Sequence, residues 1–247
     1  MQLKNIFKIV LLGLQLNTVA WAQSSAHLDP TFGNNGRVIT SIQPEGSATH
    51  PVSCLQKNGK IIVGTPIGKS LIIARYLDDG SIDNSWGTNG MVTTVMPGSL
   101  SVAKMTDMVA LDNGSVLVTG YRDTLNSNGV MVRPYIAKYD IDGTLEPGFA
   151  VNGIQTVFSD SLMLDFGLSV HDDHILAFGQ IEFSGDSIAI HALNVGDGSY
   201  DYSWGNNGTM IHEDETTNRF RVKALGENKV IMSRRKGISL FLSDGNY

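Results

Sequence analysis

A nine-residue motif occurs four times along the chain, and this repetition limits the possible folds more than any other feature. Each copy pairs an aromatic residue with a glycine four positions later. The copies occupy residues 28–36, 82–90, 145–153 and 200–208. Their aromatic residues follow one another at steps of 54, 63 and 55 residues: Phe32, Trp86, Phe149 and Trp204. A long unit repeated at nearly constant spacing predicts an array of one supersecondary element, either stacked or circular.

Within each repeat the apolar segments are short and β-branched, a pattern typical of strands rather than of helices. The first complete unit has four such segments, at residues 51–56, 60–65, 70–77 and 91–95. Asn58-Gly59 and Asp79-Gly80 lie between them and supply the positive φ angles that tight hairpins require. We therefore expect four antiparallel strands in each unit, with repeats that start near residues 28, 81, 144 and 199.

The later units follow the same plan. The second has expected strands at 108–111, 116–120, 135–139 and 154–158. The third has them at 168–170, 174–179, 188–193 and 209–212. The fourth has only three, at 222–225, 229–233 and 238–242. A repeated four-stranded antiparallel meander predicts an all-β fold, a β-propeller of four blades.

The phase of the repeats indicates how such a ring closes. Residues 37–42 follow the first motif as a single strand, whereas the last unit lacks its fourth strand. We expect residues 37–42 to complete the last blade beside 238–242, which would remove two exposed sheet edges. A larger ring assembled from two chains is the alternative. The inner strand of each blade is expected to carry small residues at one equivalent position: Cys54, Ala110, Ser169 and Ala224.

The residues also carry a resemblance to a known family. Residues 74–90, preceded by 58–64, resemble the delta-60 repeat family of bacterial proteins. The similarity extends over residues 28–245; it weakens in the third unit at Glu146, Gly148 and Ala150, and the fourth unit lacks the Arg-Tyr pair. The resemblance implies a propeller fold and an exported protein, and it implies no catalytic residues.

Residues 1–22 have the three regions of a signal peptide. Lys4 and Lys8 provide the positive start, residues 9–16 a short apolar core, and residues 20–22 a small-residue cleavage site. We expect cleavage before Gln23 and a single domain over 23–247. No cysteine follows the apolar core, so no lipid anchor is expected, and the protein is predicted to be exported to the periplasm or secreted.

Charge and cysteine content narrow the classes of partner. The chain of 247 residues has a formal net charge of −6, from 18 basic and 24 acidic residues. Such an acidic chain is poorly suited to nucleic acid or to anionic lipid, which are bound by clustered Lys and Arg. Cys54 is the only cysteine, so no internal disulfide is expected, and the thiol is interpreted as a packed core group.

Two local patterns suggest metal binding, but a structural role is favoured for both. Residues 140–146 partly resemble a calcium loop, without the full run of alternating oxygen ligands. His171 and His174 flank two aspartates where the other units have a hairpin turn, so a surface turn is favoured. The aromatic residues of the four motifs are expected to fill the space between neighbouring blades. No catalytic, metal or cofactor-binding residue is assigned, and no cofactor is expected.

Any binding site is expected on the loops opposite the hairpin turns, because variable loops on a rigid scaffold commonly carry function. These connections are residues 43–50, 96–104, 159–165 and 212–219, with an extended segment at 121–129. The favoured hypothesis is an exported binding or scaffold module for an unidentified protein or glycan. The alternative is a small hydrolase or lyase with its site at the mouth of the central channel, where acids and histidines would have to converge.

Overall fold

The computed structural model describes residues 27–42, 50–100, 102–126, 129–157, 163–181, 187–213, 220–225, 229–234 and 237–242. Over these ranges the protein is all-β and has no helix. The expected signal peptide, residues 1–22, lies outside the described residues. Among the described residues there is no helix with the length and apolar character needed to span a membrane.

Fifteen strands form four antiparallel sheets, and each sheet follows chain order without a crossover. Sheet 1 consists of β1 (Val52–Leu55), β2 (Ile61–Ile67), β3 (Ser70–Tyr76) and β4 (Met91–Val95). Sheet 2 consists of β5 (Ala103–Ala110), β6 (Val116–Asn126), β7 (Gly129–Tyr139) and β8 (Ile154–Thr156). Sheet 3 consists of β9 (Met163–His171), β10 (His174–Ile181), β11 (Ser187–Asn194) and β12 (Thr209–Glu213). Sheet 4 consists of β13 (Phe220–Leu225), β14 (Lys229–Arg234) and β15 (Gly237–Leu242).

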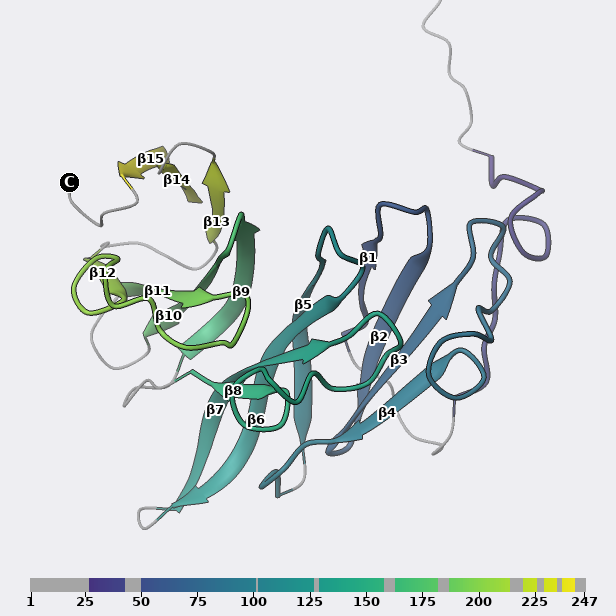
Figure 1. Ribbon diagram of the computed structural model, residues 1–247, viewed down its shortest axis with the longest axis horizontal. Coiled ribbons are helices and arrows are strands. Elements are labelled where there is room, and N and C mark those ends of the chain that lie inside the picture. The colour runs from purple at the N-terminus through teal and green to yellow at the C-terminus, as the bar shows by residue number, and fades with distance from the viewer. Residues whose placement is uncertain are drawn as a thin grey trace, which may run out of the picture.

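The four sheets stand side by side in an arc, with their first strands toward its centre (Figure 1). β1 contacts β5, β5 contacts β9, and β9 contacts β13, so the first strand of each sheet is its inner strand. In the described ranges β13 makes no contact with β1, and the arc is open between sheet 4 and sheet 1 (Figure 1).

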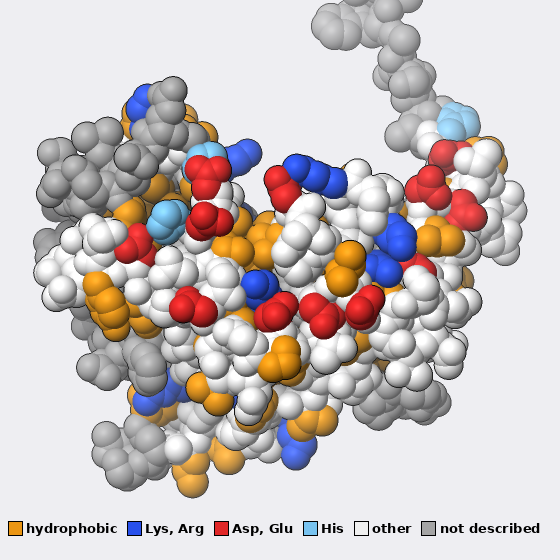
Figure 2. Space-filling model, viewed as in Figure 1, with side chains coloured by type: hydrophobic (Ala, Val, Ile, Leu, Met, Phe, Trp, Pro, Cys, Tyr) orange, Lys and Arg blue, Asp and Glu red, His pale blue; other side chains and the backbone are white. Residues whose placement is uncertain are grey.

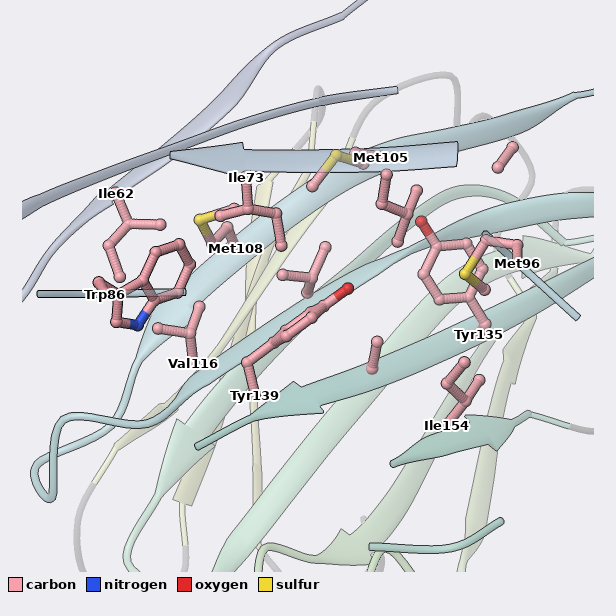
Figure 3. Packing of buried hydrophobic residues seen from close by; sticks show 14 residues of the cluster. Ile62, Ile73, Trp86, Met96, Met105, Met108, Val116, Tyr135, Tyr139 and Ile154 are labelled. Carbon is pink, nitrogen blue, oxygen red and sulfur yellow. The ribbon is translucent and has the colours of Figure 1, made fainter. Parts of the chain in front are cut away.

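Three apolar clusters fill the three interfaces between neighbouring sheets. The cluster between sheets 1 and 2 includes Trp86, Met105, Tyr135 and Tyr139, all at most 1% exposed. Figure 3 shows these side chains directed into the layer between the two sheets. Sheets 2 and 3 therefore have both faces buried against neighbouring sheets, which explains why a central strand such as β11 is almost continuously apolar.

The repeated motif makes the joint between one sheet and the next. Gly87 N donates to the carbonyl oxygen of Asp142, and Ala150 N donates to that of Asp197, in each case a turn of the following sheet. The aromatic ring of the motif covers the glycine of the same turn. A Cβ on Gly143 would lie 2.7 Å from Trp86, and one on Gly198 would lie 2.9 Å from Phe149. The expectation that these aromatic residues fill the space between neighbouring sheets is confirmed for Trp86, Phe149 and Trp204. Phe32 instead lies against Gly80 of sheet 1 from the N-terminal segment.

A basic side chain lies over the aromatic ring at two of these joints. Arg75 lies 5.4 Å from the centre of the Trp86 ring, and Lys138 Nζ lies 5.6 Å from the centre of the Phe149 ring. Both also reach the following sheet, since Arg75 Nη1 donates to the carbonyl of Ile141 and Lys138 Nζ to that of Val195. Arg75 and Lys138 thus add directed hydrogen bonds to joints that are otherwise made by apolar burial.

The structure differs from the expected ring closure. Residues 37–42 form no strand, and β15 pairs only with β14, so sheet 4 has three strands. The reason is spatial, because the N-terminal motif lies beside sheet 1 while sheet 4 lies at the other end of the arc (Figure 1). Ile39, Ile238 and Leu240 consequently remain 94%, 71% and 58% exposed.

Two smaller expectations are wrong. Residues 121–126 and 129–134 are not a loop but the outer half of the β6–β7 hairpin, whose pairing extends to Asn126 opposite Gly129. The four small residues are not equivalent either. Ala110 pairs with Val116, the first residue of β6, and Ser169 pairs with Leu176, the third residue of β10. Cys54 and Ala224 lie between these positions, opposite the second residues of β2 and β14, Ile62 and Val230.

Candidate functional site

All four sheets contribute to one pocket of about 650 Å³ at the centre of the arc. Val52 of β1, Asp107 of β5, Phe178 of β10 and Arg221 of β13 line it, together with residues on either side of them. Lys104 and Tyr121 place the pocket at the end of the sheets opposite the Asn-Gly hairpins, on the side with the irregular connections. Its volume lies in the range typical of small-molecule sites.

A β-bulge positions the acidic group of the pocket. The β5–β6 register shifts between Met105 and Asp107, so Thr106 is an extra residue on the inner strand. Asp107 Oδ1 accepts a hydrogen bond from Met108 N at 2.9 Å, and Oδ2 accepts one from Leu168 N at 3.3 Å. Bulges re-aim side chains near functional sites. Here the bulge leaves a carboxylate that bridges β5 and β9 and still lines the pocket.

Two basic side chains line the same pocket from different sheets. Lys104 Nζ lies 5.3 Å from the centre of the Tyr121 ring, and the Lys104 carbonyl accepts a hydrogen bond from the Tyr135 hydroxyl at 2.8 Å. Arg221 is exposed, and its Nη1 donates to the carbonyl of Phe220 at 2.9 Å. Neither cation forms a salt bridge with a carboxylate of the described ranges.

The floor of the pocket is apolar and rigid. Phe166 and Phe178 are buried, and the Phe178 ring meets Phe220 edge to face with 5.7 Å between the ring centres. Cys54 lies on β1, close to Asp107. Burial, followed by the negative charge of Asp107, raises the pKa of the Cys54 thiol to about 12, so this group stays protonated and unreactive at neutral pH.

The pocket agrees in part with the site expected from the sequence. His50 and Lys104, from two of the loops on the irregular side, line it as expected. Asp107, Gln180 and Arg221 were not singled out, because they lie within strands and no sequence pattern marks them as inward-facing. Residues 43–49, 159–162 and 214–219 of the expected loops lie outside the described residues.

The His171–His174 segment forms the expected surface turn between β9 and β10. His171 Nε2 lies 3.1 Å from Asp172 Oδ2, whereas His174 Nε2 lies 3.0 Å from Asp201 Oδ2, so the two rings face different carboxylates. The described ranges contain no group of three or more His, Cys, Asp or Glu residues placed to hold a metal ion.

In the segment that resembles a calcium loop, the Asp140 side chain bonds to the backbone of its own turn. Asp140 Oδ1 accepts hydrogen bonds from Asp142 N at 3.0 Å and from Thr144 N at 2.8 Å. This is the side-chain-to-backbone pattern by which Asp stabilises a tight turn. Gly143 has the positive φ of 88° that the turn requires. The observed geometry therefore fits the structural interpretation.

Two further grooves lie at the hairpin end of the sheets. One, of about 390 Å³, lies between sheets 1 and 2, and Lys57 and Asp112 on its rim form a salt bridge of 2.6 Å. The other, of about 560 Å³, lies between sheets 2 and 3 and is lined by Asp112, Asp172 and Asp173. In Figure 2 the Lys and Arg side chains of the described residues are scattered among acidic ones and form no broad basic area on the face shown.

Comparison with protein-family models and with curated proteins identifies no relative of this chain. No protein-family model matches the chain, and no significant match is found among curated proteins. The chemical interpretation therefore rests on the residues of the pocket themselves.

Proposed function

We propose that this protein is an exported binding module that holds a protein or glycan partner at the central pocket. The observation that supports this most strongly is the convergence of all four sheets on one pocket of about 650 Å³, whose wall carries two cations without a carboxylate partner among the described residues. A pocket that combines cations, an amide and an aromatic ring suits selective binding, because each kind of group contacts a different part of a ligand.

The alternative, a hydrolase or lyase at the same position, has weaker support. His50 and Asp107 both line the pocket, but both carboxylate oxygens of Asp107 already accept hydrogen bonds from backbone N–H groups. A general base must lie within hydrogen-bond reach of its acid–base partner or of the proton that it removes, and no ion pair joins His50 to Asp107 among the described residues. The binding role makes no such demand on Asp107.

A ligand screen with matched variants tests the binding role. The purified protein is screened against a glycan array and against extracellular proteins, and each hit is measured again with Tyr121→Ala and Tyr202→Ala. Tyr121 lines the pocket, whereas Tyr202 is 70% exposed on the fourth motif, outside the pocket. We expect Tyr121→Ala to weaken binding tenfold or more and Tyr202→Ala to leave it unchanged. Hits that are indifferent to Tyr121, or a screen without hits, would contradict the proposal.

We also propose that the four sheets are the blades of a β-propeller, of the kind implied by the resemblance to delta-60 repeat proteins, and that residues 37–42 complete the last blade. The N-terminal segment already contacts sheet 1 as the end of a preceding blade would. Gly33 N donates to the carbonyl of Asp79 as Gly87 N does to that of Asp142. The Thr40–Tyr76 hydroxyl contact of 2.7 Å likewise matches the Tyr139–Thr94 bond of 2.9 Å.

These matched contacts make residues 33–42 equivalent to residues 87–96, which contain β4. Sheet 1 thus has a segment equivalent to the last strand of a preceding blade docked on it, while sheet 4 has no fourth strand among the described residues. Pairing of residues 37–42 with β15 would cover Ile39, Ile238 and Leu240 and would leave the contacts with sheet 1 intact. Closure requires only that sheet 4 and sheet 1 approach each other.

A further inference from the structure

We infer that the ligand of the central pocket is an acidic glycan, a sugar chain that carries carboxylate groups. The inference deepens the proposed function and depends on it. It begins from the charge of the pocket wall, where Lys104 and Arg221 outnumber Asp107 in a chain whose net charge is −6. A local excess of positive charge on an acidic protein attracts an anionic ligand.

The hydrogen bonds and ion pairs of these charged groups also favour a negatively charged ligand. Asp107 accepts hydrogen bonds from two backbone N–H groups, and these dipoles offset part of the field of its negative charge. Lys104 and Arg221 have no carboxylate partner among the described residues, and Arg221 uses only Nη1, on the carbonyl of Phe220. A guanidinium binds a carboxylate through two parallel N–H donors, whereas an ammonium acts as a point charge.

The neutral groups of the wall favour a sugar over a peptide. Gln180 offers an amide that can both donate to and accept from ring hydroxyls, and Thr106, whose hydroxyl donates to the Thr119 carbonyl at 3.3 Å, can accept from them. Phe166 and Phe178 are at most 2% exposed, so they form a floor and offer little surface to an apolar peptide side chain. Tyr121 adds a half-buried aromatic ring at the rim. The pocket thus presents two cations, an amide and an aromatic ring beside apolar surface.

Calorimetric titration with two matched trisaccharides tests the inference. The probes are the trimer of galacturonic acid and a neutral galactose trimer, titrated into the purified protein at low ionic strength. We expect the acidic trimer to bind at least tenfold more tightly than the neutral one and to weaken as salt is added. Arg221→Gln and Lys104→Gln should each weaken it about tenfold. Lys223→Gln, an exposed cation on the same strand outside the pocket, should leave it unchanged.

Additional probes distinguish sugars from other anions. Chemical-shift mapping distinguishes a failure of this inference from a failure of the proposed function. Tighter binding of a pentaglutamate peptide or of inorganic phosphate would overturn the choice of a glycan. Equal binding of both trisaccharides, with amide chemical-shift changes in β5, β9 and β13, would overturn the acidic inference and leave the proposed function standing. Shift changes elsewhere would contradict both. No binding of either trisaccharide to a parent protein that melts normally would overturn the inference alone, because the proposed function also allows a protein partner.

Discussion

At the scale of single residues, the repeated motif depends on one backbone conformation that three copies give to glycine. Gly33, Gly87 and Gly205 have φ of 57°, 57° and 55°, and Ala150 has φ of 47° at the same position of the third copy. The hydrogen bond that follows is 2.8 Å at Thr88 N but 3.4 Å at Val151 N, where the alanine stands. The Ala150 methyl is therefore accommodated by a looser turn.

Ala150→Gly should stabilise the protein. A left-handed conformation costs a non-glycine residue about 1 kcal/mol, and part of that gain is offset by the greater freedom of glycine in the unfolded chain. We expect the free energy of unfolding in urea to rise by about 0.5 kcal/mol. Gly87→Ala should lower it by about 2 kcal/mol, since the added Cβ would lie 2.5 Å from the Met91 carbonyl oxygen. Equal effects of the two changes would contradict this interpretation of the turn.

His191 should make stability fall as the pH is lowered below neutrality. The ring is 6% exposed, Nδ1 contacts Thr209 Oγ1 at 2.9 Å, and burial lowers the pKa of His191 to about 4. Because the unfolded chain takes up this proton near pH 6.5, stability is lost as the pH falls from 6.5 through 4. We expect this one group to contribute a loss on the order of 2 kcal/mol between pH 7 and pH 4.5.

Urea unfolding at both pH values measures this contribution. His191→Gln should flatten the difference between pH 7 and pH 4.5, and His50→Gln, which removes an exposed histidine, should not. An unchanged slope in the His191 variant would show that its ring is charged in the folded protein.

At the scale of elements, the joints between sheets should contribute more stability than any surface contact. Trp86 is fully buried and covers the turn at Gly143 of the next sheet. Trp86→Ala should lower the free energy of unfolding by about 4 kcal/mol, the loss typical of a large buried aromatic residue. Tyr202→Ala removes a 70% exposed ring and should change it by less than about 0.5 kcal/mol. A Trp86 variant of nearly normal stability would mean that the sheets are not joined in this way.

The strand positions could be predicted from the sequence because each strand is short, apolar and bounded by a glycine turn. β4 matches the expected segment 91–95 at both ends, and the other strands match within a few residues except where they run on toward the irregular side. The outer half of the β6–β7 hairpin was missed because Arg122, Asp123 and Asn126 give it the composition of a loop. Its pairing is decided by the inner half, which continues the ladder outward.

The pocket could not be predicted from the same patterns. Asp107 reaches the pocket only because Thr106 is an extra residue in β5, and a bulge leaves no trace in an alternating pattern. In the sequence, Arg221 is one of several charged residues at the start of a strand. That it lines the same pocket as Lys104 follows from the angles between the sheets. Such angles are set by side-chain packing at the joints, which is a property of the whole arc.

At the scale of the whole molecule, the central claim is that one four-stranded sheet is repeated around a single axis. The inner strands contact one another in succession, and the matched contacts of Gly33 and Thr40 place the N-terminal segment where a preceding sheet would end. The exposed apolar side chains at Ile39 and Leu240 lie on the two unpaired edges. These observations favour a ring over an open stack.

The distance between positions 39 and 240 tests this claim most directly. Nitroxide labels at Ile39→Cys and Leu240→Cys, in a Cys54→Ala background, are measured by electron paramagnetic resonance in the purified protein, with and without dilution by unlabelled chain. Neighbouring strands lie about 5 Å apart, so a ring closed within one chain predicts a label separation below about 20 Å that persists on dilution. A separation well beyond this value, or a short one that disappears on dilution, would contradict a ring of four sheets closed by its own N-terminal strand.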